Sequence, residues 1–358
     1  MVDWSLARSI ARFAAGEDRV PNLGVDLAAV VAAMEPRVAD YTGLVLDRPV
    51  PAPELLCRGA WAELNLDSLA ELLEPVAARL DERLEFAGPL AGALRIGASA
   101  TLAAEAGLVI GYLAHRVLGQ YELSLLVPST RLPGRTGEPA RLVFVAPNLD
   151  QAVRQLAVDR DSFYGWIAIH ELTHVFQFQG VGWLQEHVAS LVREYMETVE
   201  VRIQSGAAGG IPSLPHPAKL VEAYREGGLA ALVQTQEQRE LTNRIQGTMG
   251  VIEGYSEHVM DALGEELLPA WKGLREALER RRRSRSAPER VLQRLLGLDL
   301  KMRQYDHGRR FCDGVVARGG MDTLNRVWDE PASLPSEAEL KRPAAWLERI
   351  RTSAKTPA

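Results

Sequence analysis

An H-E-x-x-H motif, His170-Glu171-Leu172-Thr173-His174, constrains this chain more than any other feature. Two histidines four residues apart lie on the same face of a helix, about one turn from each other, so both imidazoles can reach one metal ion. Glu171 follows the first histidine, where its carboxylate can take a proton from a water at the metal instead of binding the metal. The motif therefore predicts a helix that carries two metal ligands and a general base.

The residues around the motif carry no charge, as a helix under the floor of a dry cleft requires: Ile169, Leu172, Thr173, Val175 and Phe176. The alternative interpretation is a pair of helix-surface histidines beside a solvated glutamate.

A hydrolytic zinc site needs a third protein ligand and one open position for water. No Gly-x-x-His follows His174 within a dozen residues, so a site with three histidines is not expected. Two histidines and a glutamate remain, with Glu186, Glu253 and Glu257 as candidates. A tight turn after the motif helix could bring Glu186 back to the histidines.

Glu253 opens the phrase Glu-Gly-Tyr-Ser on an expected helix. This phrase is similar to the way many metallopeptidases with two histidines and one glutamate present their third ligand. In those enzymes an acidic residue four positions on, here Glu257, usually orients a ligating histidine. On this resemblance Glu253 is preferred to Glu186. The plain alternative is a solvated helix residue beside a packing glycine.

The developing oxyanion needs a hydrogen-bond donor. Tyr255, His258 and Tyr121 are candidates, although each is expected more often to be structural. The remaining histidines considered are expected to be structural or surface residues: His187, His115 and His307.

Composition limits the classes of partner. The chain has 358 residues, 47% hydrophobic and 25% charged, and a net charge of −6, so no global basic field attracts nucleic acid or an anionic membrane. Residues 272–310 are locally basic and are expected to be a solvated helix end and loop.

Cys57 and Cys312 form no ligand pair, and a reduced cytoplasmic setting is expected. No signal peptide is expected at the N-terminus. Arg95 and Glu105 interrupt the most apolar stretch, Leu90–Ala114, which is expected to be a buried helix.

Apolar spacing predicts a mainly α chain. Helices are expected over 3–15 with Asp3 as N-cap, over 26–35 ending at Pro36, and over 65–84, 94–118, 183–201 and most of 220–278. Steps of four between Ala103, Gly107 and Gly111 predict the close approach of a neighbouring helix. Residues 48–53 are expected to form a connection.

Residues 122–127 and 141–146 are expected to form a β-hairpin around a loop at 128–140. Leu142–Val145 either lines a substrate cleft and pairs with an extended peptide, or is a plain structural strand. The expected domains are a helical N-terminal domain with the hairpin at 1–150, a metal-site domain at 151–350 and a polar tail at 351–358. The loop at 205–217 is long enough to be a lid or a spacer.

Several phrases together resemble one family, the zincin-like metallopeptidases of type 2, which are bacterial proteins often labelled hydrolases or associated with deazaflavin-coenzyme biosynthesis. The phrases are LNLDSLAELLEPV (64–76), HRVLGQYE (115–122), RLVFVAPN (141–148), HELTHVFQFQGVGWLQEH (170–187), IEGYSEHVMD (252–261), LLGLDLKMRQYDHGRRF (295–311) and NRVWDEPASLPSEAEL (325–340). The resemblance spans most of the chain. It implies a mainly helical, two-part zincin-like fold and supports His170, Glu171, His174 and Glu253 as site residues. Some members of the family carry degraded motifs, so the fold alone does not guarantee catalysis.

These observations favour a cytoplasmic zinc-dependent hydrolase of the peptidase type, in which Glu171 is the general base and the substrate is a peptide or small amide. The alternative is a non-catalytic binding or scaffold protein that keeps a zincin fold. Binding to nucleic acid is a third and more distant interpretation, and no membrane association is expected.

Overall fold

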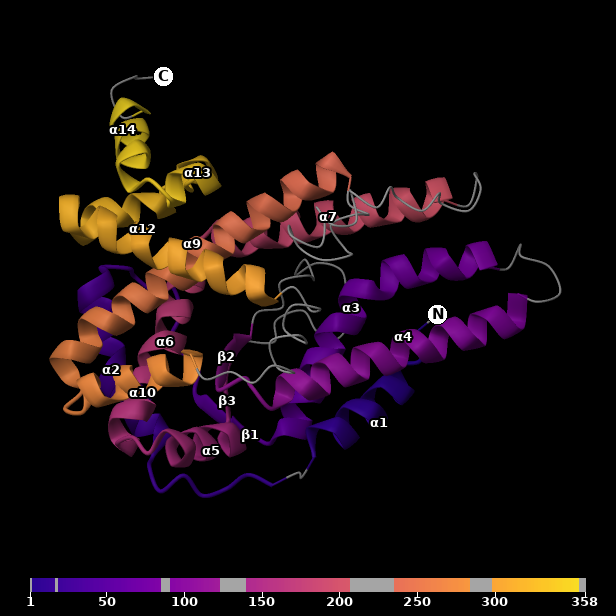
Figure 1. Cartoon of the computed structure of the whole chain (residues 1–358), viewed down its shortest axis with the longest axis horizontal. Helices are drawn as coiled ribbons and strands as arrows, with labels where there is room; N and C mark the ends of the chain where they lie inside the picture. The colour runs from indigo at the N-terminus through magenta and orange to yellow at the C-terminus, as the bar shows by residue number, and fades with distance from the viewer. Residues whose placement is uncertain are drawn as a thin grey trace. The chain divides into compact units, whose positions relative to one another are not determined.

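The computed structural model describes residues 2–16, 19–84, 91–122, 140–206, 235–283 and 298–353 (Figure 1). In these ranges the chain is mainly helical with a three-stranded sheet, which confirms the predicted fold class. Contacts divide the chain into two units, residues 1–33 with 49–171 and residues 34–48 with 172–358. The border falls inside one continuous helix, α6 (Arg160–Gly180). None of the helices in the described ranges is both long and apolar enough to cross a lipid bilayer.

The first unit holds the sheet, several helices and the start of α6. Its elements are α1 (Trp4–Ala15), the first part of α2 (Leu27–Thr42), β1 (Pro53–Leu56), α3 (Arg58–Leu84), α4 (Ala91–Ala114), β2 (Gly119–Glu122), β3 (Arg141–Val145) and α5 (Ala146–Leu156). Helices α1, α3 and α4 pack against one another (Figure 1).

Small residues let α1 and α4 approach closely, as the four-residue spacing predicts. A side chain at Gly107 would meet the carbonyl oxygen of Ala7 at 2.7 Å, and one at Gly111 would meet Ala14 at 2.5 Å. Asp3 is the N-cap of α1, since its carboxylate accepts a hydrogen bond from the backbone N–H of Leu6, also as predicted.

Strand β3 is the centre of a sheet with the order β1-β3-β2. Residues Leu142–Val145 are fully buried, and β2 pairs with β3 in the antiparallel direction, with Gly119 opposite Phe144. The predicted antiparallel pairing of Arg141–Val145 is therefore confirmed, but the described partner strand is 119–122. Residues 123–139, which include the rest of the predicted partner strand and nearly all of the predicted loop, lie outside the described residues.

Three local predictions are wrong. The apolar stretch expected to be a buried helix does form α4, but this helix is not buried throughout, since Ile96 and Leu108 are exposed. Helix α2 does not end at Pro36 but continues to Thr42, where the buried side chains of Val38 and Thr42 offset the backbone hydrogen bond that proline cannot make. The predicted connection also reaches one residue too far, because Pro53 begins β1, a short edge strand parallel to β3. Proline is tolerated at the first residue of an edge strand.

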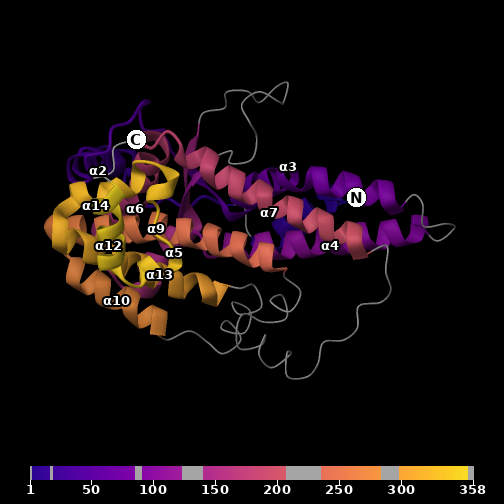
Figure 2. The same cartoon turned by 90° about the horizontal axis from the view of Figure 1, so that it is seen from above.

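The second unit is built around two long helices, α9 (Gln236–Leu267) and α12 (Leu298–Asn325), which pack along each other (Figure 1). α7 (Leu184–Gly206) lies beside α9 (Figure 2). The other elements are α10 (Trp271–Arg283), η2 (Arg326–Trp328), η3 (Pro331–Ser333), α13 (Glu337–Leu340) and α14 (Pro343–Ser353). The predicted loop at 205–217 lies almost wholly outside the described residues, as do the end of the predicted polar tail and the middle of the basic segment.

Candidate metal centre

Helix α6 carries the H-E-x-x-H motif in its central turns. Asp159 begins the helix, since its carboxylate accepts a hydrogen bond of 2.8 Å from the backbone N–H of Ser162. The uncharged residues that surround the two histidines are all buried: Ile169, Leu172, Thr173, Val175 and Phe176. The motif therefore lies on an interior helix, as its uncharged neighbours predict.

A side chain outside the motif sets the orientation of His174. Gln177, one turn further along α6, is fully buried, and its amide nitrogen donates to the carbonyl oxygen of Ile252 at 3.0 Å. Its amide oxygen therefore faces His174 Nδ1, at 2.9 Å. Because an amide oxygen only accepts, Nδ1 carries a proton, and Nε2 is the ring nitrogen left to bind a metal. His174 is thus held in the tautomer that a metal ligand at Nε2 needs.

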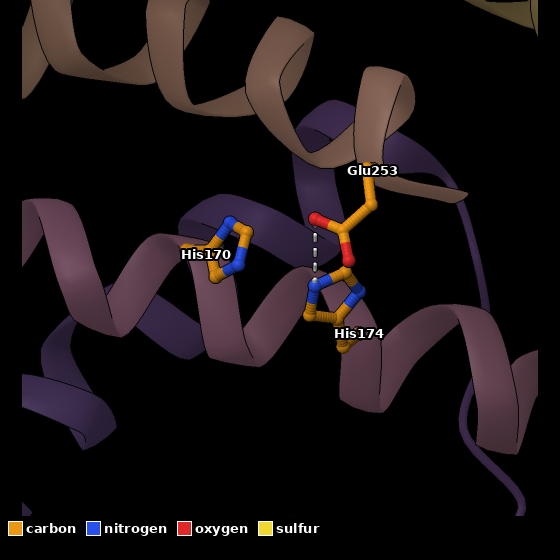
Figure 3. Close-up of side chains that lie close together, drawn as sticks. All are labelled: His170, His174 and Glu253. Carbon is orange, nitrogen blue, oxygen red and sulfur yellow. Dashed lines mark ion pairs between the residues drawn. The ribbon is translucent and has the colours of Figure 1, made fainter. Parts of the chain in front are cut away.

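Glu253 comes from α9 and points toward the imidazoles of α6 (Figure 3). Its Oε2 lies 3.8 Å from His174 Nε2, and both side chains are largely buried, with exposed fractions of 22% and 11%. The Gln177 bond to Ile252 joins α6 to the residue just before Glu253. One buried amide therefore fixes the positions of two of the three candidate ligands.

The glycine after Glu253 allows α9 to pack closely against α12 beside the candidate ligand. A side chain at Gly254 would meet the backbone of Gly308 on α12 at 2.2 Å, and one at Gly308 would meet the carbonyl oxygen of Gly250 at 1.8 Å. The two helices thus cross backbone to backbone beside the candidate ligand. In the Glu-Gly pair, Glu253 supplies a carboxylate, and Gly254 allows the backbone of α12 to approach α9 where a side chain would not fit.

His170, His174 and Glu253 form a group able to hold a metal ion, with one donor atom from each within 4.8 Å of the others. Two imidazole nitrogens and one carboxylate oxygen are a donor set that zinc uses when a fourth position stays open. Two ligands on a tetrahedral zinc lie about 3.4 Å apart, close to the separation of His174 and Glu253. The residues present fit a metal.

Glu171 follows the first of these histidines and is only 4% exposed. Its role as a general base stays a prediction. Glu257, one turn after Glu253 on α9, is half-buried, and its orienting role stays a prediction.

The alternative third ligand, Glu186, lies elsewhere. Its side chain is 70% exposed and forms an ion pair with Arg193 along α7. The metal-capable group found among the described residues contains Glu253 and not Glu186.

The candidate oxyanion donors on α9 are engaged in other contacts. Tyr255 is fully buried and donates to Asn325 Oδ1 at 2.9 Å, and burial raises the pKa of its hydroxyl far above the ordinary value. His258 lies between Tyr41, 2.9 Å from Nε2, and Asp313, 2.7 Å from Nδ1. Both side chains thus link α9 to its neighbours. Tyr121, in β2, is nearly buried, and its role stays a prediction.

The other described histidines and the two cysteines fit structural roles. His187 packs its ring edge-on against Trp183, and burial, followed by the charge of Arg244, lowers its pKa. His115 bonds the carbonyl oxygen of Ala14, and His307 is half-buried on α12. Cys57 and Cys312 do not form a disulfide.

Sequence reasoning missed Gln177. A signal was available, since an uncharged polar residue three positions after His174 shares the buried side of an apolar helix and needs a hydrogen-bond partner there. The backbone of Ile252, 75 residues further on, gave no such signal.

Comparisons with known proteins find a similar family and a similar solved structure. The model of a family described as zincin-like metallopeptidases matches residues 2–347. A crystal structure from Chloroflexus aurantiacus, described as a "putative hydrolase with a novel fold", is 30% identical, with a TM-score of 0.68 over 98% of this chain and 99% of that chain. A search of curated proteins finds no match.

Proposed function

The chain belongs to the family of zincin-like metallopeptidases, and we propose that it is a zinc-dependent hydrolase that cleaves a peptide or small amide. The observation that carries the proposal is the group formed by His170, His174 and Glu253, with the buried carboxylate of Glu171 next to it in the chain. A pure binding protein needs no acid at the second position of the motif.

In the proposed mechanism, His170, His174 and Glu253 would hold zinc. When bound, a zinc ion would lower the pKa of water and polarise a carbonyl group. Gln177 keeps the His174 imidazole in the required tautomer. Glu171 accepts a proton from the attacking water and then donates it to the leaving amine, acting first as base and then as acid. The low exposure of Glu171 keeps competing solvent away from that carboxylate.

The direct test is hydrolysis of a library of internally quenched peptides by the zinc-loaded protein. We expect cleavage by the wild type and a loss of roughly 100- to 10,000-fold in Glu171→Gln, because that variant keeps the ligands but cannot accept the proton. Glu186→Gln is the matched control, since it neutralises an exposed carboxylate on α7.

Equal rates for wild type and Glu171→Gln would contradict the mechanism. A zinc-loaded wild type that cleaves neither peptides nor small amides would favour the non-catalytic binding protein.

A further inference from the structure

The backbone of β2 lies against the side chain of Glu171 at Gly119. A β-carbon built on Gly119 would lie 2.6 Å from Oε1 of Glu171 and 2.9 Å from both Cδ and Cγ. Non-bonded carbon atoms ordinarily stay about 3.5–4.0 Å apart. The carboxylate therefore occupies the space that any side chain at position 119 would fill.

Backbone conformation is not the reason for a glycine here. The described glycines with positive φ are Gly16, Gly24, Gly43 and Gly320. Gly119 has a strand conformation that every L-residue adopts, and it pairs with Phe144. Space for Glu171 is the constraint that remains.

Strand β2 cannot easily retreat from Glu171. The carbonyl oxygen of Leu118, just before the strand, accepts a hydrogen bond of 2.9 Å from Val145 of the buried strand β3. Gln120, the residue after Gly119, is tied to α3. Trp61 Nε1 donates to Gln120 Oε1 at 2.7 Å, and Gln120 Nε2 donates to Asn65 Oδ1 at 3.2 Å.

Of the two groups in contact, Glu171 is expected to yield before the strand, because its carboxylate is the end of a side chain and not part of a backbone. A methyl group at position 119 should therefore displace the acid and leave the strand in place. This differs from Gly308, where the obstacle is the backbone of another helix.

We propose that Gly119 is a positioning residue for the general base: the absence of a side chain at this position leaves the space in which the Glu171 carboxylate lies. The inference rests on the proposed function for its consequence in catalysis, while the contact itself can be tested without activity.

The first test is a spectroscopic measurement on metal-free protein carrying ¹³C in the glutamate carboxyl groups. The Glu171 signal is assigned by its loss in Glu171→Gln. We expect Gly119→Ala to shift this signal at constant pH and to keep the unfolding temperature within about 2 °C of wild type. Gly182→Ala, which introduces a methyl group into open space after α6, should leave the signal unchanged.

The second test is kinetic, on zinc-loaded protein with a peptide that the wild type cleaves. Gly119→Ala should keep its zinc and its KM, while kcat falls by about 100-fold, as expected for a misplacement of about 1 Å. Shortening the acid by Glu171→Asp should cost less in the Gly119→Ala background than in the wild type, because the two changes act on one contact.

An unchanged Glu171 signal in Gly119→Ala overturns the proposal, as does loss of folding, since the strand and not the acid would then have yielded. A shifted signal with unchanged kcat also overturns it. If the wild type hydrolyses nothing, the proposed function fails on its own, and the carboxyl signal decides whether Gly119 sets the position of Glu171.

Discussion

Gln177 shows how one buried side chain can organise a site. It accepts from His174 on one side and donates to Ile252 on the other, so it orients one candidate ligand and holds the helix that carries another. Gln177→Met keeps similar volume and removes both hydrogen bonds. We expect zinc affinity to fall by roughly 10- to 100-fold, measured by competition with a chromophoric chelator. Unchanged affinity in a folded variant would show that His174 needs no such support.

His187 gives a prediction about pH, also at the scale of a single residue. Burial and Arg244 lower its pKa in the folded chain, so the unfolded chain binds the proton more readily. The stability of the folded state should be unaffected by this group above pH 7 and should fall as the pH drops through about 6.5, the ordinary histidine value. His187→Gln lacks this proton uptake.

Denaturant unfolding of wild type and His187→Gln across pH 5 to 7.5 checks this sign. The stability of wild type relative to the variant should decrease on acidification. A constant difference would mean that His187 titrates alike in both states.

At the scale of elements, the crossing of α9 and α12 fixes the position of Glu253. Gly308→Ala places a methyl group 1.8 Å from the carbonyl oxygen of Gly250, and neither backbone can turn away. We expect a loss of about 3 kcal/mol or more in unfolding free energy, together with weaker zinc binding.

Gly273→Ala on α10 is the matched control for this crossing, because its methyl group would enter open space. This change should be neutral or stabilising by up to about 1 kcal/mol. Equal melting temperatures for the two variants would argue against a tight crossing.

Local sequence patterns predicted most of the helices and the helix that carries the motif. Contacts between residues far apart in the sequence could not be predicted from such patterns. The four-residue spacing put His170 and His174 on one face, and Asp3 marked the start of α1. The prediction that a helix ends at Pro36 is wrong, because the burial of Val38 and Thr42 outweighs the tendency of proline to end a helix.

Glu253 was preferred through a family resemblance, since spacing alone could not separate it from Glu186. The structure explains why a glycine follows Glu253: a side chain at Gly254 would collide with the backbone of Gly308 on α12. Neither that crossing nor the approach of Gly119 to Glu171 leaves a periodic signal in the sequence.

At the scale of the whole molecule, a bound metal should stabilise the folded chain, because the donor set exists only when α6 and α9 are in place. Free zinc at 100 times its dissociation constant adds about 2.7 kcal/mol. Zinc should therefore raise the melting temperature of the wild type, and a chelator should reverse the change. His170→Ala/His174→Ala should show no such rise, and an equal rise there would place the stabilising metal elsewhere.

The most direct test is the metal content of protein purified without chelator or affinity tag, measured by mass spectrometry for wild type, Glu253→Ala and Glu186→Ala. We predict about one zinc per chain in the wild type and in Glu186→Ala, and a clear loss in Glu253→Ala. Full zinc in Glu253→Ala, or no metal in folded wild type even after zinc is added back, would contradict the assigned metal centre.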